Sequence, residues 1–432
     1  MRTVSFVFIR NGKMLKISIL TIGDEICIGQ ITNTNSVWIA QQCVRLGCMP
    51  LMHSTIGDNK EHIVSELDRL NAFSDIIIIT GGLGPTHDDI TKPTLCEYYG
   101  DELVLNQDVL EELKRRYAQR GIDLSERNAM QAWLPSRCKV LHNPIGTAPG
   151  MLFEQGGKIV VSLPGVPREM MKLIELYVLP LIAEETVKRN EDVVVYKNLQ
   201  TSGITESNLA DRIGKPEDFL GDATLAFLPS YQGVRLRIGA NGTDMQHATD
   251  KINQIENIIR ERAGKYIFGT DDDNLSSAVG RLLKSRGETV AVAESCTGGL
   301  LGGAITAIAG SSAYFAGGMI TYSNDAKISH LGVNSETISK YGAVSGETAE
   351  EMAEQVRLKF GTDFGISITG IAGPDGGSYD KPVGTVWIGL SSKDAKRSTV
   401  YLFGEDRVIN RERSVGTALK LLMDAIGIKE NG

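Results

Sequence analysis

The 432-residue sequence has few of the features that mark secreted, membrane-spanning or nucleic-acid-binding proteins. No segment reaches the ~18 uncharged apolar residues of a membrane span. The net charge of −8 argues against a general nucleic-acid binder, which would carry a basic face. The six cysteines are scattered and lack the spacing of a metal site, a pattern that is ordinary for cytosolic proteins. They are Cys27, Cys43, Cys48, Cys96, Cys138 and Cys296. We therefore expect a cytoplasmic protein with no membrane partner and no nucleic-acid partner.

The length of the chain predicts more than one domain. The charged and polar residues 186–198 suggest one boundary, and the aspartate run within Thr270 to Asn274 suggests a second. A second possible start, Met14, lies directly before the first convincing strand, so we expect residues 1–13 to be a poorly anchored extension of the reading frame. The remainder is expected to form three domains, over residues 14–188, 189–269 and 270–432.

The first of these domains alternates strand-like and helix-like segments, which predicts a parallel sheet with right-handed crossovers. The β-branched run Asp75 to Thr80 is typical of a parallel strand that is buried on both faces. The segment Leu103 to Arg120 reads as one long amphipathic helix. Further strands are expected at residues 16–22, 50–56 and 159–163.

Two acidic pairs follow strand ends in this domain, Asp24-Glu25 and Asp88-Asp89. Adjacent carboxylates repel each other unless a cation or a hydrogen-bond donor lies between them. Mg²⁺ takes oxygen ligands from few carboxylates together with phosphates. The pairs therefore favour a metal-bridged phosphate ligand, with Glu169 as a further metal ligand or as a partner of the helix dipole. The alternative is that Asp88 only caps the following helix.

A glycine-rich loop precedes the second acidic pair. Gly81, Gly82 and Gly84 leave a backbone without side chains that can wrap around phosphates, and Thr86 follows them. A glycine-rich loop alone is a weak signal. The order of glycines, threonine and paired acids favours a binding function.

The motif AESCTGG at residues 293–299 lies between an apolar, strand-like run and a helix-like run. Ser295 is therefore expected on a strand-to-helix turn, where α/β sheets place their ligands. Gly298 and Gly299 would let the backbone approach a substrate, and the helix N-terminus would offer N–H groups to an anion. A serine there is a nucleophile if another group takes its proton. The alternative is that Ser295 and Thr297 only cap the helix.

The same domain also places a tyrosine and a lysine in turns, Tyr322 and Lys327. A nearby ammonium favours phenolate and desolvation lowers a lysine pKa, so the pair can receive the serine proton. Glycine turns at residues 298–299 and 370–373 would supply N–H donors to an oxyanion. Arg407 and Arg411 would grip a phosphate. Together these groups suit acyl transfer from a small phosphorylated amide without a cofactor.

Several motifs together resemble the CinA family (competence/damage-inducible protein A): TGGLGPTHDDITK (80–92), NPIGTAPG (143–150), AESCTGG (293–299), YSNDAK (322–327) and ITGIAGPDGG (368–377). The resemblance implies an N-terminal, parallel-sheet, molybdopterin-binding-like domain that hydrolyses ADP-ribose with a divalent metal. It implies a C-terminal α/β amidohydrolase domain that deamidates nicotinamide mononucleotide to nicotinate mononucleotide and ammonia. The middle α+β domain resembles the family's KH-like domain, but it has no Gly-x-x-Gly loop, so nucleic-acid binding is not supported.

Carried over by residue, the family's serine, tyrosine and lysine fall on Ser295, Tyr322 and Lys327. Candidate substrate-binding residues are Thr297, Gly298, Gly299, Thr369, Gly370, Gly373, Arg407 and Arg411 in the C-terminal domain, and Gly81, Gly82, Gly84 and Thr86 in the N-terminal domain. Candidate ligands for Mg²⁺ or a similar cation are Asp24, Glu25, Asp88, Asp89 and Glu169. The resemblance also implies a homodimer.

Three functions remain open at this point. The first is a bifunctional hydrolase of pyridine-nucleotide metabolism. The second is a molybdopterin-binding or transfer protein, because a shared fold does not fix the ligand. The third is a competence-linked interaction protein with vestigial sites, against which the intact serine, tyrosine and lysine weigh.

Overall fold

The structure is a computed structural model that describes most of the chain, namely residues 15–86, 89–189, 192–230 and 233–428. The proposed extension over residues 1–13 and the candidate metal ligand Asp88 lie outside the described residues. Within these described ranges no helix is long and apolar enough to cross a membrane. One compact unit reaches Tyr196 and includes Gly239–Asn253, and the other comprises Lys197–Ile238 and the chain from Gln254 onward.

The N-terminal domain is built on a sheet with the strand order β2-β1-β3-β8-β7-β6. The first four strands are parallel, as predicted, while β7 and β6 add an antiparallel edge. The strands are β1 (Ile17–Ile22), β2 (Pro50–Ile56), β3 (Ile76–Thr80), β6 (Lys139–Leu141), β7 (Gly150–Gln155) and β8 (Lys158–Leu163). The helices are α1 (Asp24–Cys27), α2 (Thr34–Arg45), α3 (Lys60–Asn71), α4 (Thr91–Tyr98), α5 (Gln107–Gln119), α6 (Glu126–Ala129), α7 (Pro167–Leu173) and α8 (Leu179–Arg189).

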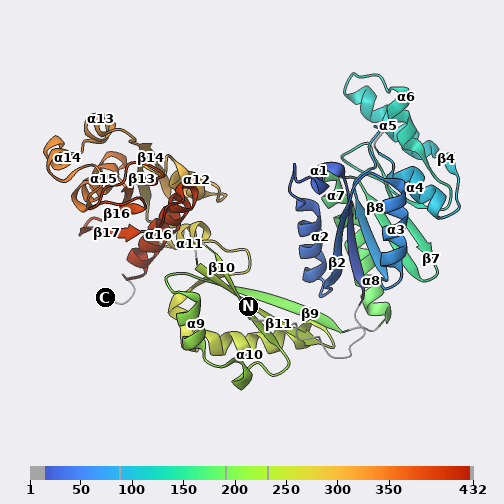
Figure 1. The fold of residues 1–432 in the computed structure, drawn as a ribbon, viewed down its shortest axis with the longest axis horizontal. Helices are drawn as coiled ribbons and strands as arrows, with labels where there is room; N and C mark the ends of the chain where they lie inside the picture. Colours follow the sequence, from blue (N-terminus) through green and yellow to red (C-terminus); the bar gives the residue numbers. More distant parts are fainter. Residues whose placement is uncertain (1–14, 87–88, 190–191, 231–232, 429–432) are drawn as a thin grey trace. The chain divides into compact units, whose positions relative to one another are not determined.

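Helices cover both faces of this sheet because its central strands are apolar on both sides. Along β3, Ile76 and Ile78 pack with the residues of α2, α7 and α8, whereas Ile77 and Ile79 pack with those of α3, α4 and α5. This follows from the alternation of side chains along a strand. Figure 1 shows α2 and α3 on opposite sides of the strands.

The long helix predicted from Leu103 to Arg120 is wrong at its beginning. Residues Leu103–Leu105 form a short strand, β4, which pairs with β5 (Trp133–Pro135). Helix α5 starts only after Asn106, whose side chain accepts a hydrogen bond from the backbone N–H of Val109 at 3.0 Å. An asparagine cap of this kind fixes the helix start, and the helical spacing of apolar residues does not reveal it.

The middle of the chain forms a second sheet, with the order β10-β11-β9-β12. Its elements are β9 (Val193–Thr201), α9 (Glu206–Ile213), β10 (Thr224–Ser230), β11 (Gly233–Gly242), α10 (Met245–Ala263) and β12 (Ile267–Thr270). The predicted α+β character of this part is therefore confirmed.

The C-terminal domain has a mixed sheet with the order β14-β13-β15-β16-β17. Strands β14, β13 and β15 are parallel, and β16 and β17 are antiparallel to their neighbours. The strands are β13 (Val290–Glu294), β14 (Phe315–Ile320), β15 (Phe364–Gly370), β16 (Thr385–Ser391) and β17 (Lys396–Leu402). The helices are α11 (Leu275–Arg286), α12 (Leu300–Thr306), α13 (Asn324–Ala326), α14 (Ser335–Tyr341), α15 (Gly346–Phe360) and α16 (Arg407–Ile428).

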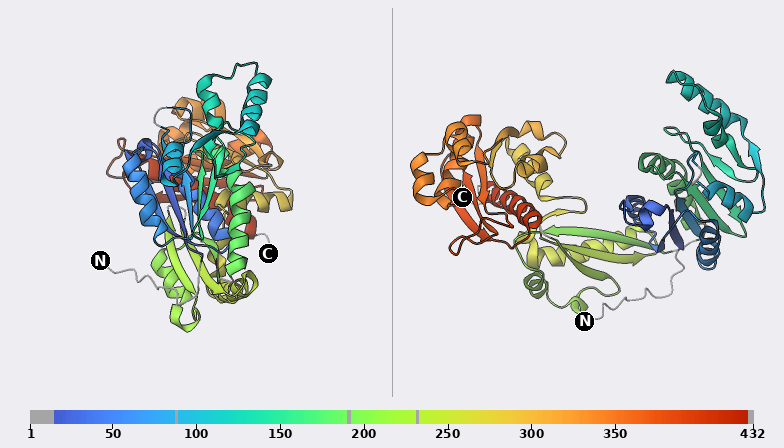
Figure 2. Two further views of the ribbon diagram at one scale, coloured as in Figure 1. Left: turned by 90° about the vertical axis from the view of Figure 1, so that its right-hand side faces the viewer. Right: turned by 45° about the horizontal axis from the view of Figure 1, so that its top comes forward.

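Helices again cover the two faces of this sheet. Val290 and Val292 of β13 pack with residues of α11, α12 and α16, while Ala291 and Ala293 pack with residues of α15. Figure 2 shows α16 as a long helix, coloured red, beside the strands of its own domain. The carboxyl end of β13 lies between two parallel neighbours, and the chain enters its serine turn at that point.

Candidate functional sites

Ser295 lies directly after β13 and before α12, on the strand-to-helix turn that its sequence predicts. Its backbone N–H donates to the carbonyl of Ile368 on β15 at 2.9 Å, which fixes the turn to the neighbouring strand. The residue is 8% exposed. Its hydroxyl accepts a hydrogen bond from Nζ of Lys327 at 3.0 Å.

Lys327 is only 1% exposed, and it is the first residue of a π-helical turn, Lys327–Leu331. Besides Ser295, its Nζ contacts the backbone carbonyls of Thr321 at 2.9 Å and Tyr322 at 3.3 Å. Burial lowers the pKa of Lys327 because it penalises the charged ammonium. A neutral amine has two protons and one lone pair. In that state the two carbonyls would accept the two protons and the Ser295 hydroxyl would donate to the lone pair, whereas the ammonium donates to Ser295 Oγ.

The side chain of Tyr322 makes no hydrogen bond to Ser295 or Lys327, although the predicted proton path requires one. Its side chain is 62% exposed, and its hydroxyl accepts a hydrogen bond from Nη2 of Arg407 at 3.2 Å. The other terminal nitrogen of Arg407 donates to the carbonyl of Gly373 at 2.7 Å. The structure therefore joins Ser295 and Lys327 directly. The tyrosine contributes its backbone carbonyl to Lys327 and its hydroxyl to Arg407, so the Tyr322–Ser295 proton path is not assembled in this arrangement.

Glu294, the last residue of β13, is a functional candidate that sequence reasoning missed. It is 1% exposed, and its carboxylate accepts hydrogen bonds from the N–H groups of Gly299 (3.0 Å), Leu301 (3.1 Å) and Gly302 (2.8 Å). The N–H of Gly298 donates to the carbonyl of Ser295 at 3.1 Å. The expectation that this helix N-terminus and its glycines offer N–H groups to an anion is therefore not met, because a carboxylate of the protein already occupies it.

Of the other residues predicted for this site, some lie beside the serine turn and others only stabilise the surrounding fold. Nη2 of Arg411 donates to the carbonyl of Thr297 at 2.8 Å, which places this arginine beside the serine turn. Among the described residues, Nε of Arg411 and the hydroxyl of Thr297 are buried without a hydrogen-bond partner. Thr369 donates to the carbonyl of Ala343 at 2.7 Å. Any side chain added at Gly370 would lie 2.7 Å from the carbonyl oxygen of Thr385, so this glycine permits close strand packing.

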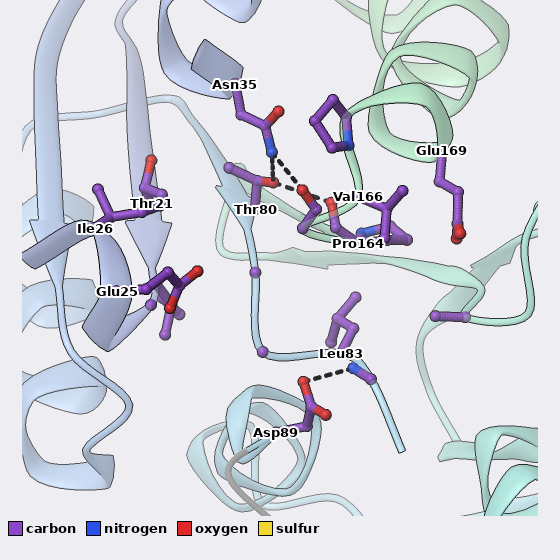
Figure 3. Close-up of a pocket in the computed structure, with 18 of the residues that line it drawn as sticks. Thr21, Glu25, Ile26, Asn35, Thr80, Leu83, Asp89, Pro164, Val166 and Glu169 are labelled. Carbon is purple, nitrogen blue, oxygen red and sulfur yellow. Dashed lines mark hydrogen bonds between the residues drawn. The ribbon is translucent and has the colours of Figure 1, made fainter. Parts of the chain in front are cut away.

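The N-terminal domain has a pocket of about 410 Å³ at the carboxyl ends of β1, β3 and β8. Figure 3 shows Glu25, Asp89 and Glu169 approaching it from three different segments. Polar residues on its lining that sequence reasoning did not assign to a site include Thr21, Asn33, Asn35, Asp58 and Thr80. Every lining side chain is neutral or acidic, and the described part of the lining has no lysine or arginine.

The carboxylate of Asp89 holds the glycine-rich loop through hydrogen bonds to the loop backbone and to Thr86. It accepts hydrogen bonds from the N–H of Gly84 (2.7 Å), the N–H of Thr86 (2.8 Å) and the hydroxyl of Thr86. The N–H of Gly81 donates to Leu163 on the neighbouring strand β8 at 3.1 Å. Gly81, Gly82 and Gly84 line the pocket, whereas Thr86 is turned to Asp89.

The first acidic pair is also split by the fold. Asp24 does not line the pocket; its carboxylate accepts the N–H of Asp58 at 3.1 Å, and the carboxylate of Asp58 accepts the N–H of Asp24 at 3.0 Å. Glu25 lines the pocket. Within the residues that the structure describes, no three acidic, histidine or cysteine side chains form a ready-made metal site. The cation thus stays a prediction, with Glu25 and Glu169 as its better-placed ligands.

The fold and these sites define a multidomain α/β protein with a serine–lysine site on one sheet and an acidic, glycine-lined pocket on another. The chain matches three family models: the probable molybdopterin binding domain at residues 18–184, the damage-inducible protein CinA KH domain at 196–269, and the CinA C-terminal domain at 272–426. The chain therefore belongs to the CinA family.

Relatives match over nearly the whole length. The CinA-like protein of Salinibacter ruber is 42% identical over 408 residues, which cover 94% of this chain and 98% of that protein. The CinA-like protein of Chloroherpeton thalassium is 42% identical over 417 residues, with the same two shares. Among solved structures, the competence/damage inducible protein CihA from Agrobacterium tumefaciens is 40% identical and covers 36% of this chain and 97% of that one, with a TM-score of 0.34.

We predict that Glu294→Gln destabilises the C-terminal domain. The amide keeps one acceptor but places an N–H₂ group against backbone N–H donors in a buried position. Hydrogen bonds to charged groups contribute about 1.5–3 kcal/mol each, so the loss should be about 2–3 kcal/mol. Chemical denaturation followed by circular dichroism measures it. Glu412→Gln, at an exposed glutamate of α16, is the matched control. Equal stability of the two variants would show that the cap is unimportant.

Proposed function

We propose that this protein is a bifunctional hydrolase of pyridine nucleotides. Its C-terminal site would deamidate nicotinamide mononucleotide to nicotinate mononucleotide and ammonia, and its N-terminal pocket would hydrolyse ADP-ribose. The observation that carries the first activity is the contact of 3.0 Å between Nζ of buried Lys327 and Oγ of Ser295. The homodimer that the resemblance implies remains a prediction.

In the proposed deamidation, neutral Lys327 takes the proton of Ser295 as Oγ attacks the amide carbon of the nicotinamide group. Lys327 then returns the proton to the amide nitrogen, the C–N bond breaks, and ammonia leaves. A water then gives a proton to the same amine as its oxygen attacks the ester carbon. The C–Oγ bond breaks, the amine returns the proton to Oγ of Ser295, and the nicotinate carboxylate leaves. Ser–Lys pairs are a known variant of the catalytic triad, and burial, which lowers the pKa of Lys327, favours the neutral amine that a base requires.

The phosphate of the substrate is assigned to the arginines rather than to the helix N-terminus. Glu294 already engages the first N–H groups of α12, so an anion there would meet a carboxylate. Arg411 lies beside the serine turn, where it donates to the carbonyl of Thr297. Arg407 donates to the carbonyl of Gly373, in the loop that follows β15. Guanidinium groups bind phosphate through paired N–H donors.

The N-terminal proposal is supported by the charge of the pocket. Its lining combines Glu25, Asp58, Asp89 and Glu169 with a glycine loop and has no described cationic side chain. A pyrophosphate would be repelled from this lining unless a divalent cation accompanies it. An all-oxygen donor set suits Mg²⁺, which keeps phosphate and water ligands.

In this pocket Glu25 and Glu169 would hold the cation, and the backbone of Gly81, Gly82 and Gly84 would lie along the phosphates. The cation, when bound, neutralises charge on the pyrophosphate. The oxygen of an attacking water would form a bond to one phosphorus as the P–O bond of the pyrophosphate bridge breaks. A carboxylate of the pocket lining would accept the proton of that water.

A second candidate for this domain is binding of a molybdopterin compound, which the match of residues 18–184 to the probable molybdopterin binding domain favours. The two proposals differ in their product. ADP-ribose hydrolysis yields two phosphate monoesters, whereas a binding protein leaves its ligand intact, and chromatography after incubation with ADP-ribose distinguishes them.

We expect Ser295→Ala to abolish ammonia release from nicotinamide mononucleotide, because the proposed nucleophile is gone. ADP-ribose hydrolysis should stay within about twofold of the parent, because that reaction uses a separate domain. A coupled ammonia assay and chromatography of the nucleotides measure the two activities. Retained deamidation would eliminate Ser295 as the nucleophile, and loss of both activities would point to misfolding.

Lys327→Met should lower kcat for deamidation by about 10²–10⁴-fold, the usual contribution of general acid–base groups. The KM should stay within about tenfold, because Lys327 is not assigned to the phosphate. In the parent, kcat should rise with pH through an inflection below the ordinary lysine value, because burial favours the neutral amine that accepts the proton. This rise should be absent from the variant. A large KM increase at unchanged kcat would make Lys327 a substrate anchor instead.

Glu25→Gln should raise the Mg²⁺ concentration that gives half-maximal ADP-ribose hydrolysis by about tenfold, because one cation ligand loses its charge. Activity at saturating Mg²⁺ should recover in part. Glu61→Gln, on the exposed surface of α3, is the matched control. An unchanged metal titration for Glu25→Gln would remove this residue from the proposed site.

A further inference from the structure

The loop that follows β6 is held by one buried side chain, that of Asn143. This residue is 4% exposed. Its Oδ1 accepts the N–H groups of Ile145 at 3.1 Å and Gly146 at 2.9 Å. Its Nδ2 donates to the carbonyl of Ala148 at 2.9 Å and to Oε2 of Glu169 at 2.7 Å. The amide thus uses two acceptor sites and both protons, and turning it over would set donors against donors.

Glu169 is placed unusually for its position in α7. It is the third residue of a helix whose first residue is Pro167, where a glutamate commonly turns back toward the N-cap. Here its carboxylate instead reaches the loop, with Oε2 on Asn143. A side chain at Gly146 would lie 1.9 Å from Oε2, so the glycine leaves the space that the carboxylate fills.

The loop is also fixed from its outer side. Arg116 of α5 donates to the carbonyls of Asn143 and Gly146. The next residues, Thr147 and Ala148, line the pocket together with Glu169. Asn143 itself does not line the pocket, so its effect on a ligand must pass through the groups that it holds.

We propose that Asn143 is a positioning residue for ADP-ribose hydrolysis: it orients the carboxylate of Glu169 toward the pocket, with Oε2 held and Oε1 available to the bound cation. This inference rests on the proposed function of the N-terminal domain. It assigns a role to a side chain 26 residues away from Glu169 in sequence.

Asn143→Asp separates orientation of Glu169 from support of the loop. The aspartate keeps acceptors for the N–H groups of Ile145 and Gly146, but it loses the donor to Glu169 and sets two carboxylates against each other. We expect kcat for ADP-ribose to fall at least ~10-fold, with a KM change below about threefold. Gly146→Ala should have a similar effect, because it displaces the same carboxylate while Asn143 remains.

A double-mutant cycle tests whether Asn143 acts through Glu169. Glu169→Gln alone should also lower kcat, and the double variant Asn143→Asp/Glu169→Gln should lie within about threefold of the slower single variant. Ile145→Ala, in the same loop with a side chain that is 47% exposed, is the control and should keep parental activity. Independent, multiplicative losses in the cycle, or full activity of Asn143→Asp, would overturn the proposal.

Hydrogen exchange supplies a measurement that needs no substrate. The peptide that contains Ile145 and Gly146 should exchange at least ~10-fold faster in Asn143→Ser and near the parental rate in Asn143→Asp. If the parent does not hydrolyse ADP-ribose, the proposed function fails, and this exchange comparison alone decides whether Asn143 holds the loop. Unchanged exchange in Asn143→Ser would overturn the inference in either case.

Discussion

The C-terminal site depends on a lysine amine that is buried among neutral partners. Nζ of Lys327 meets the hydroxyl of Ser295 and two backbone carbonyls, and no carboxylate contacts it among the described residues. A buried ammonium without a counter-ion is costly, so the surroundings favour the neutral amine. Burial favours the neutral form of the adjoining thiol of Cys296 as well, because it raises the pKa of that thiol to about 11. Of the adjacent side chains Ser295 and Cys296, it is Ser295 that hydrogen-bonds to the amine.

Several carboxylates at or beyond strand ends accept hydrogen bonds from backbone N–H groups, so they are not all free to bind a ligand. Glu294 accepts hydrogen bonds from N–H groups of α12, and Asp89 accepts them from the glycine-rich loop. Asp24 and Asp58 each accept the backbone N–H of the other. Each is held where the polypeptide leaves a sheet and its N–H groups lose their strand partners. An acidic residue after a strand is therefore ambiguous in sequence, and only the bonds that it makes show which acids remain for a cation.

The sequence predicts those features that depend on neighbouring residues. The apolar run before Ser295 and the isoleucines of β3 locate strands, and the turns after them locate both sites. The three-residue strand β4 is too short to give a periodic signal, and its pairing with β5 depends on residues about 30 positions later. The contacts of Asn143 with Glu169 and of Arg407 with Tyr322 join segments 26 and 85 residues apart. Residue types suggest such groups, but only the fold decides which of them meet.

Under the proposed function, the two sites would bind anionic substrates by opposite means. The serine site has Arg411 beside the turn and Arg407 hydrogen-bonded to the loop that contains Gly373, and its buried carboxylate, Glu294, already accepts hydrogen bonds from N–H groups. In the proposed function these two arginines would hold the phosphate monoester of the substrate. The N-terminal pocket has carboxylates and no described lysine or arginine on its lining, so a pyrophosphate needs a cation that arrives with it. This difference in charge explains why a divalent metal is proposed for one domain only, and it makes metal dependence the property that separates the two activities in the intact chain.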